Sequence, residues 1–291
     1  MNILIAIDTS AGSEIIIREV SARAWPSGST LSVLTVVEPS YPSELPELYT
    51  WAVKESDRLV REAAERLSAC GLKAAAILKE GDPKAVIVQE ADRMRADLLI
   101  VGASGHSGMT RFLVGSVTRT AVRFAHCSVE IVRPRAQKQT GGQDCMRVLL
   151  ATDGSEGSSV AAQSIAKRPW PANCEFEIVS VVEPEVSALN LPQAWLDPVA
   201  MEARRAADMQ RAQKAIAEAE AILADSGLKV SGNVLIPIAT SKELILDEAD
   251  KLQADLIVVG SHGRRGIKRF LLGSVSEAVA MHAICSVEVI R

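Results

Sequence analysis

The sequence predicts two doubly wound α/β sandwich domains in tandem, and three observations support that prediction. Short aliphatic runs alternate with helical stretches along the whole chain. The pattern G-x2-G-x9-G-S occurs twice, each time directly after an apolar run. Matching residues surround both copies, so the repeat extends over about half of the 291 residues. Because solenoid units are only roughly 20 to 50 residues long, this repeat indicates duplication of a whole domain.

Five short apolar runs in the first half are bounded by turn residues, which is typical of strands. They are continuous rather than alternating, as expected of strands buried on both faces of a parallel sheet. The runs are Ile3–Ile7, Leu31–Val37, Ala74–Leu78, Leu98–Val101 and Val129–Val132. Helices are predicted between them at Ser13–Ala24, about Leu48–Ala69, Pro83–Arg95 and Ser116–Ala125. Right-handed crossovers then give a sheet with helices on both faces.

The second half repeats this arrangement. Its predicted strands are Val148–Thr152, Glu177–Val182, Val230–Ile236, Leu256–Val259 and Val287–Ile290, and its longest predicted helix is Met201–Ala224. One helix start is marked differently in the two halves. Asp82 followed by Pro83 is an N-cap with a first-turn proline, whereas Thr240 with Glu243 forms a capping box.

A polar segment containing Gly141-Gly142 separates the halves, and its composition is typical of a flexible linker. We therefore predict an N-terminal domain at residues 1–134, a linker at 135–144 and a C-terminal domain at 145–291. Halves of about 140 residues are close to the commonest domain size, and each is large enough to bury its own core.

Composition and charge argue against several classes of protein. The net charge of -4 and the pI near 5.7 give no general attraction to nucleic acid or to an anionic membrane. No apolar run approaches the roughly 20 residues that span a bilayer, and the chain enters a strand without a cleavable leader. We therefore expect a cytoplasmic protein.

The five cysteines of the chain include no C-x-x-C pair and are expected as reduced thiols. The matched Cys127 and Cys285 are either redox sensors or small buried residues.

The glycine motif follows the fourth predicted strand of each half. Open α/β sheets bind ligands beyond the carboxyl ends of their strands, where the strand order reverses. There, backbone N–H groups and a helix dipole together meet an anion, and a glycine lets the backbone approach phosphate oxygens. A serine at the helix start adds a hydroxyl donor. The candidate residues are Gly102, Gly105, Gly115 and Ser116, with their counterparts Gly260, Gly263, Gly273 and Ser274.

The spacers within the two motifs differ in charge. The first carries only Arg111 with His106. The second carries four cations, Arg264, Arg265, Lys268 and Arg269. We expect either stronger phosphate binding in the second half or a solvated basic face.

A carboxylate ends the first predicted strand of each half, at Asp8 and Asp153. Three roles fit this position: accepting from a ribose or adenine donor, holding Mg2+ through water, or capping the following helix. The sequence has no Walker A lysine motif and no G-x-G-x-x-G after the first strand, so it is neither a P-loop NTPase nor a standard dinucleotide-binding domain. The four histidines show no metal-binding spacing.

These motifs carry a resemblance to a known family. Both halves resemble the universal stress protein A domain, and the whole chain apart from the linker resembles a tandem universal stress protein. In the ATP-binding branch of that family the fingerprint is the same G-x2-G-x9-G followed by Ser or Thr, which both copies satisfy. The resemblance implies an adenine nucleotide alpha hydrolase-like fold with a five-stranded parallel sheet of order 3-2-1-4-5 in each domain. It also implies that Val129–Val132 and Val287–Ile290 pair as an intramolecular pseudo-dimer, and it leaves open a homodimer of chains.

By the same resemblance, each half is expected to bind ATP, with Mg2+. Asp8 and Asp153 would bind the nucleoside end and reach Mg2+ through water, with Val37 and Val182 near adenine. The glycine loop and the following helix start would hold ribose and phosphates. The implied residues are Ala6, Asp8, Val37, Val101, Gly102, Gly105, Gly115, Ser116, Val117, Ala151, Asp153, Val182, Val259, Gly260, Gly263, Gly273, Ser274 and Val275.

The sequence favours a binding module, namely an ATP-binding stress-response protein that senses or buffers adenine nucleotide and alters its contacts with protein partners. Slow ATP hydrolysis is one alternative, although no water-orienting base is evident. An adaptor with vestigial nucleotide sites is another, although two intact fingerprints count against it.

Overall fold

The structure, a computed structural model, divides into two units. It describes residues 1–39, 46–104, 114–134, 145–182, 198–224, 226–236, 239–264 and 272–291. Unit 1 consists of Met1–Thr140, Arg168–Pro171 and Ala280–Arg291, and unit 2 consists of Gly141–Lys167 and Ala172–Val279. The predicted linker lies outside the described residues, so the domain boundaries at 134 and 145 stay a prediction.

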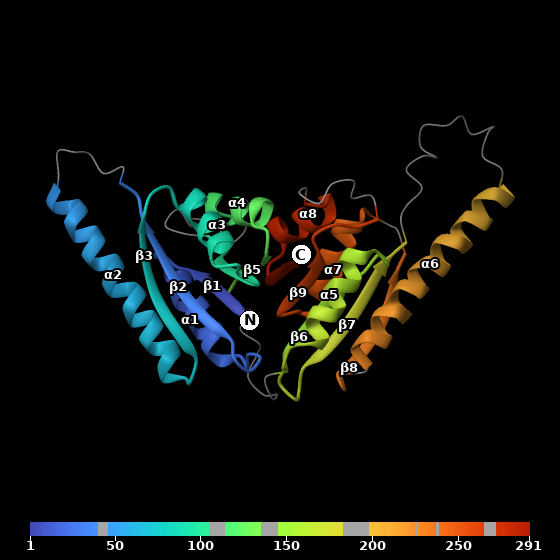
Figure 1. Ribbon diagram of the computed structural model, residues 1–291. Coiled ribbons are helices and arrows are strands. Elements are labelled where there is room, and N and C mark those ends of the chain that lie inside the picture. Colours follow the sequence, from blue (N-terminus) through green and yellow to red (C-terminus); the bar gives the residue numbers. More distant parts are fainter. Residues whose placement is uncertain are drawn as a thin grey trace. The chain divides into compact units, whose positions relative to one another are not determined.

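Unit 1 alternates strands and helices as the apolar runs predict. Its elements are β1 (Asn2–Ala6), α1 (Ala11–Ala22), β2 (Thr30–Val37), α2 (Pro46–Ala69), β3 (Lys73–Glu80), α3 (Pro83–Arg93), β4 (Leu98–Gly102), α4 (Ser116–Phe124), β5 (Ser128–Val132) and β10 (Ser286–Ile290). The first five strands are parallel in the order β3-β2-β1-β4-β5, which confirms the expected 3-2-1-4-5 arrangement. Helices α1 and α2 pack together on one face, and α3 and α4 pack together on the other (Figure 1).

The core of unit 1 lies on both sides of its central strand. Ile3, Leu4 and Ile5 are at most 1% exposed although successive side chains of a strand point to opposite faces. Helices therefore cover both faces, which is why the strand shows a continuous rather than an alternating apolar run.

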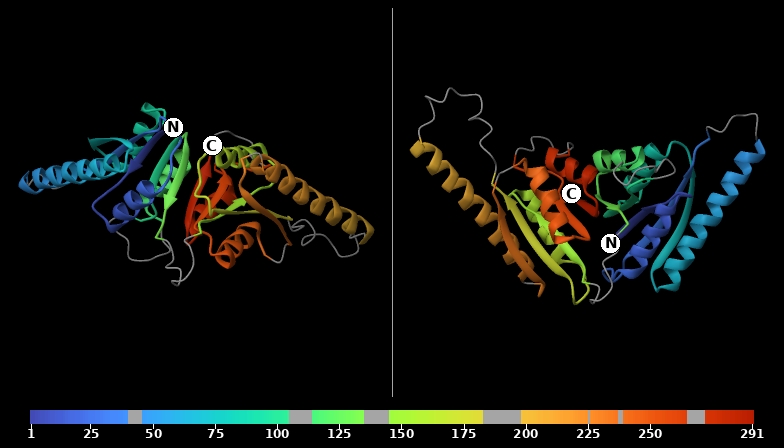
Figure 2. Two further views of the ribbon diagram at one scale, coloured as in Figure 1. Left: turned by 90° about the horizontal axis from the view of Figure 1, so that it is seen from below. Right: turned by 180° about the vertical axis from the view of Figure 1, so that it is seen from behind.

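Unit 2 repeats most of this arrangement. Its elements are β6 (Arg147–Ala151), α5 (Glu156–Ala166), β7 (Glu175–Val181), α6 (Pro198–Ala224), β8 (Lys229–Leu235), α7 (Ser241–Leu252), β9 (Leu256–Gly260) and the start of α8 (Ser274–His282). The strands are parallel in the order β8-β7-β6-β9, the same as β3-β2-β1-β4. Helices α5 and α6 pack together, and α6 runs along β7 and β8 (Figures 1 and 2).

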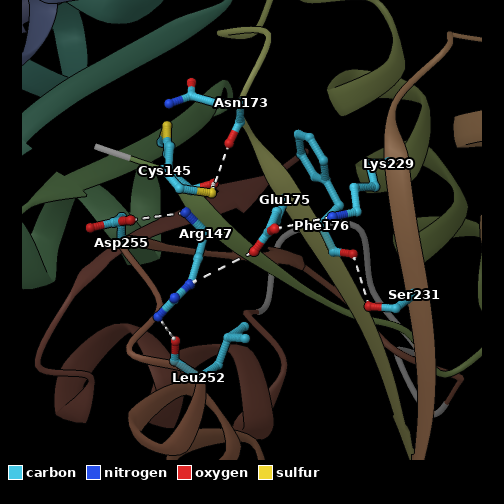
Figure 3. Close-up of polar contacts among 10 residues, drawn as sticks. Cys145, Arg147, Asn173, Glu175, Phe176, Lys229, Ser231, Leu252 and Asp255 are labelled. Atoms are coloured by element: carbon cyan, nitrogen blue, oxygen red, sulfur yellow. Dashed lines mark hydrogen bonds and ion pairs between the residues drawn. The ribbon is translucent and has the colours of Figure 1, made fainter. Parts of the chain in front are cut away.

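The matched Asp97 and Asp255 join the first and fourth strands of each repeat at the amino-terminal edge of the sheet. Asn2 N donates to Asp97 Oδ2 at 2.7 Å, and Arg147 N donates to Asp255 Oδ2 at 2.9 Å. Figure 3 shows the second of these contacts, with Glu175 bridging Arg147 and Lys229 beside it. This part of the repeat therefore serves the fold, at the edge opposite the candidate site.

Both marked helix starts are confirmed. Asp82 Oδ1 accepts from Lys84 N at 3.0 Å, and α3 begins at Pro83. At the start of α7, Thr240 N donates to Glu243 Oε2 at 3.0 Å in a capping box. Two different side-chain solutions thus satisfy orphan backbone donors at equivalent helix ends.

Within unit 1, β10 pairs antiparallel with β5, as the resemblance implied, and Glu288 lies directly opposite Glu130. Both carboxylates are at most 1% exposed. Arg23 Nη1 donates to Glu130 Oε2 at 2.6 Å, and Arg168 Nη2 donates to Glu288 Oε2 at 2.8 Å. Two opposed glutamates are accommodated because each has its own guanidinium partner.

A second pair of arginines follows the same two strands. Arg133 Nη2 donates to the Ala280 carbonyl at 2.8 Å, and Arg291 donates to the Val122 carbonyl. These carbonyls belong to the last turns of α8 and α4, where acceptors lack helical partners and cations are favourable. Each arginine therefore stabilises the last helix of the other repeat.

Candidate functional site

The strand-end glycines of the two motifs meet different neighbours. A Cβ placed on Gly260 would lie 2.5 Å from the carbonyl carbon of Gly157 and 2.9 Å from Ser158 N, in the first turn of α5. A Cβ placed on Gly102 would meet Ile16 Cδ1 at 3.5 Å, an ordinary contact. At Gly260 the close approach of the protein's own helix α5 is sufficient reason for glycine, and a role in phosphate approach stays a prediction.

Helix α4, which follows the first glycine loop, starts without a side-chain cap. Gly115 is the N-cap of α4, with φ -62° and ψ 159°, and no side chain there accepts from the first turn. Its own N–H donates to the Ala103 carbonyl at 2.8 Å, just as Gly273 N–H donates to the Ser261 carbonyl at 2.8 Å. The glycine amides thus fix the turn, and the first-turn N–H groups of α4 beyond them are left for an external acceptor.

Two buried hydroxyls, which the sequence analysis missed, hold these helices to their strands. Thr118 Oγ1 donates to the Gly102 carbonyl at 2.6 Å, and Ser276 Oγ donates to the Gly260 carbonyl at 2.6 Å. Both lie three residues after the last glycine of the motif, so a hydroxyl at that position was the signal available in the sequence. They place the two helix starts in the same way relative to β4 and β9.

Asp8 is half-buried at the end of β1 and is organised by the turn that follows. Ser10 N donates to Asp8 Oδ1 at 2.9 Å, and Ser13 Oγ donates to the same oxygen at 3.2 Å. These bonds tie the carboxylate to the turn before α1, but the N-cap of α1 is Ser10 and no side-chain hydrogen bond caps this helix, so the capping role predicted for Asp8 is wrong.

Asp153 joins the end of β6 to the glycine loop of unit 2. Ser155 N donates to Oδ1 at 3.0 Å, and Arg264 N donates to Oδ2 at 3.0 Å. A Cβ on Gly263 would lie 2.6 Å from Oδ2, so glycine is required for this contact. Burial alone would raise the pKa of Asp153, but the hydrogen bonds from Ser155 and Arg264 outweigh it, and the pKa is lowered. The carboxylate is therefore ionised at neutral pH.

A small pocket of about 10 Å³ lies beside Asp153 at the carboxyl end of the unit 2 sheet. The ends of β6 and β7, the glycine loop and α6 contribute to it. Its lining residues are Asp153, Ser180, Val181, Asp208, Arg211, Ala212 and Arg264. This is the edge at which open α/β sheets bind ligands.

The remaining predicted residues divide by exposure. Those at strand ends are buried: Ala6, Val37, Val101, Val182 and Val259. Gly102, Val117 and Ala151 are half-buried, whereas Ser116, Ser274 and Val275 at the helix starts are exposed. Gly105 lies outside the described residues, as do Arg111, His106, Arg265, Lys268 and Arg269 of the spacers. The predicted residues at the strand ends are therefore buried and apolar, whereas the serines at the helix starts are exposed to solvent.

Metal-ligand clusters are absent from the part of the chain that the structure describes, since no three His, Cys, Asp or Glu side chains gather there. His262 Nδ1 lies 2.9 Å from Ser261 Oγ, so this histidine is held within the glycine loop. None of the described helices is long and apolar enough to cross a membrane.

The matched cysteines Cys127 and Cys285 are half-buried and form no disulfide. Burial raises the pKa of the Cys127 thiol to about 11, more than the nearby Arg291 lowers it. A thiol that is protonated at neutral pH is a poor redox sensor, so the structure favours a packing role for Cys127.

Comparison with protein families identifies the repeat. The family model described as the universal stress protein family matches twice, at residues 1–133 and 145–291. The chain belongs to the universal stress protein family. Each match covers one repeat, so the whole chain apart from the predicted linker region has the character of a tandem universal stress protein.

Relatives of similar length are also universal stress proteins. One from Mycolicibacterium smegmatis is 27% identical over 304 residues, covering 99% of this chain and 96% of the relative. One from Mycobacterium tuberculosis is 27% identical over 303 residues, covering 100% and 96%. The crystal structure of a universal stress protein from Archaeoglobus fulgidus matches 100% of this chain and 98% of its own, with a TM-score of 0.67 and 19% identity. That structural likeness supports the fold of a two-domain universal stress protein.

Proposed function

We propose that this universal stress protein binds one adenine nucleotide, ATP, in each repeat, and that occupancy of the sites alters its contacts with protein partners during stress. The observation that supports this most is the arrangement at the carboxyl end of each sheet. A carboxylate ends the first strand, and a helix opened by glycine follows the fourth strand. A carboxylate accepts donors of a nucleoside, while a helix start favours phosphate.

Mg2+ fits this proposal as a companion of the phosphates. Asp153 accepts one N–H on each oxygen, and a carboxylate oxygen has a second lone pair for water in the shell of a hard cation. Asp8 has the same place after β1. When bound, Mg2+ would neutralise phosphate charge. The protein's own part is to present the ionised carboxylate and the first-turn N–H groups of α4 and α8.

The proposal is tested by blocking each helix start. Gly115→Val and Gly273→Val add a side chain where the phosphates would approach. Val retains the N–H that closes each turn, and the φ and ψ of Gly115 are accessible to Val. We expect each single variant to lose one equivalent of Mg-ATP in calorimetric titration, and the double variant to lose both. Circular dichroism spectra and melting temperatures check that each variant folds.

The nucleotide carried by the purified protein provides a second readout. Denaturing the wild type is expected to release ATP, which mass spectrometry detects. Detection of ADP together with ATP turnover would favour the hydrolase alternative. A wild type that carries no nucleotide and binds no Mg-ATP contradicts the proposal and favours the adaptor. Unchanged affinity in folded Gly115→Val, Gly273→Val and double variants would reject these helix starts as the sites.

A further inference from the structure

Helix α6 forms one wall of the pocket beside Asp153, through Asp208, Arg211 and Ala212. Arg211 and Asp208 form an i, i+3 ion pair on this wall. The Asp208 side chain is 13% exposed and the Arg211 side chain 59%, so the aspartate anchors an arginine that solvent still reaches. Neither residue belongs to the glycine motif or to a strand end.

The loop after β6 brings α6 close to Asp153. Gly154 has φ 72°, a conformation that favours glycine. A Cβ on Gly154 would lie 3.2 Å from Ala215 Cβ of α6. The equivalent residue of the first repeat is Thr9, which has a side chain and no positive φ. The close fit between this loop and the long helix therefore belongs to unit 2.

The long helices of the two repeats have a common register. Gly71-Leu72-Lys73 after α2 matches Gly227-Leu228-Lys229 after α6, an offset of 156. The buried faces coincide at this offset, with Val60 and Leu67 in α2 corresponding to Ile216 and Leu223 in α6. The same offset relates Arg211 to Glu55 and Asp208 to Ala52.

The repeats consequently differ by two units of charge between Glu55 and Arg211, and by one unit once Asp208, which corresponds to Ala52, is counted. Glu55 forms an ion pair with Arg58, and this hydrogen bond lowers the pKa of Glu55, so the group is an anion at neutral pH. At the same helical position unit 2 presents a guanidinium. Arg264 adds a second cation to the lining of the same pocket.

We infer that Arg211 is a specificity-determining residue of the C-terminal site, and that this site binds polyanionic nucleotide more tightly than the N-terminal site and fills first. The inference rests on the proposed function. It adds a contact from α6 that the glycine fingerprint does not assign, and it gives the two repeats different roles. A partly filled chain carries its nucleotide in unit 2, and only a higher nucleotide concentration fills unit 1.

Single-site backgrounds test this inference. Gly115→Val isolates the C-terminal site, and adding Arg211→Gln is expected to raise its Kd for Mg-ATP about three- to tenfold, the effect of one charge acting over ~7 Å through largely aqueous surroundings. The increase should be smaller for AMP, which has fewer charges, and should shrink as salt is added. Arg211→Lys should retain most of the affinity. The matched control is Arg205→Gln, which removes the same charge from an exposed position of α6 outside the pocket lining and should change Kd little.

The N-terminal site is measured in the Gly273→Val background. With wild-type α2, this isolated site is expected to have a higher Kd for Mg-ATP than the isolated C-terminal site, and Glu55→Gln is expected to lower that Kd. Equal affinities of the two isolated sites, or an Arg211→Gln effect no larger than that of Arg205→Gln, would overturn the inference while leaving nucleotide binding intact. If neither background nor the wild type binds nucleotide, the proposed function fails as well, so the two failures are distinguishable.

Discussion

Gly260→Ala should destabilise unit 2 even without ligand. The added Cβ would lie 2.5 Å from the carbonyl carbon and 2.6 Å from the carbonyl oxygen of Gly157, whereas ordinary contacts begin near 3.4 Å. The overlap is with the backbone of α5, which no side-chain rotation relieves, so β9 and α5 must separate. Overpacking a core costs about 1 to 3 kcal/mol, and we expect about 3 kcal/mol here because backbone must move.

Gly102→Ala is the matched control, since it makes the same change at the equivalent strand end of unit 1. Its Cβ would meet Ile16 Cδ1 at 3.5 Å, an ordinary contact. We expect a change below about 1 kcal/mol, because the loss of chain freedom in the unfolded state partly offsets any crowding.

Urea denaturation followed by circular dichroism gives the free energy of unfolding for both variants, and hydrogen exchange of peptides from β9 and α5 locates the effect. Exchange should accelerate in those peptides for Gly260→Ala while unit 1 remains protected. Equal stability of the two variants would refute the packing argument. A Gly260→Ala protein that is fully stable but unable to bind nucleotide would instead favour the phosphate-approach explanation for this glycine.

Two further predictions concern charged groups. Asp153→Asn removes a carboxylate whose pKa is lowered on folding, so the stability it contributes is complete above the unfolded pKa of 3.8 and is lost as pH falls through the lower folded pKa. The difference in unfolding free energy between wild type and variant, measured in urea, should therefore narrow below about pH 4. A difference that grows on acidification would contradict this prediction. Arg23→Leu leaves Glu130, which is 0% exposed, without its guanidinium partner, at an expected cost of about 3 to 5 kcal/mol of stability. The double variant Arg23→Leu with Glu130→Leu should recover most of that stability. If urea denaturation shows the double variant to be no more stable than the single one, the loss is caused by packing and not by the unpaired charge.

The central strands were predictable because each is an apolar run buried on both faces, whereas the edge strands β3 (Lys73–Glu80) and β8 (Lys229–Leu235) are largely exposed or half-buried. The first predicted strand, Ile3–Ile7, differs from β1 (Asn2–Ala6) by one residue at each end. The fit is close because burial, rather than local propensity, selects these residues. The long helix α6 begins at Pro198, three residues before the predicted Met201. Val199 and Met201 are apolar but exposed, so burial does not mark this helix start.

The sequence correctly placed the candidate residues at strand ends and helix starts, but several of the contacts that these residues make were not predictable. A sequence shows that glycine follows β9, yet it does not show that Gly157 of α5 lies against that strand end. It shows Asp153 after β6, yet not that Arg264 N–H, more than one hundred residues later, donates to it. These contacts depend on how the helices pack on the sheet. The pattern of apolar residues shows which helices and strands pack together, but it does not show which atoms come into contact.

The buried glutamates Glu130 and Glu288 were missed for a different reason. Each lies in a short apolar strand, where the repeated Ser-Val-Glu was visible only as evidence of duplication. A charged residue repeated inside an otherwise buried strand predicts a buried partner of opposite sign. Arg23 and Arg168, each two residues before a matched Trp-Pro pair, were the available candidates.

The distribution of differences between the repeats bears on function. Residues that maintain the fold have matched partners, as in Asp97 with Asp255, Thr118 with Ser276 and the arginine–glutamate pairs. Two of the many differences between the repeats lie where a ligand would bind: Gly154 replaces Thr9, and Arg211 replaces Glu55. Both change the surroundings of the pocket beside Asp153. If each repeat binds nucleotide, the two sites should therefore differ in affinity, and the single-site titrations measure that difference.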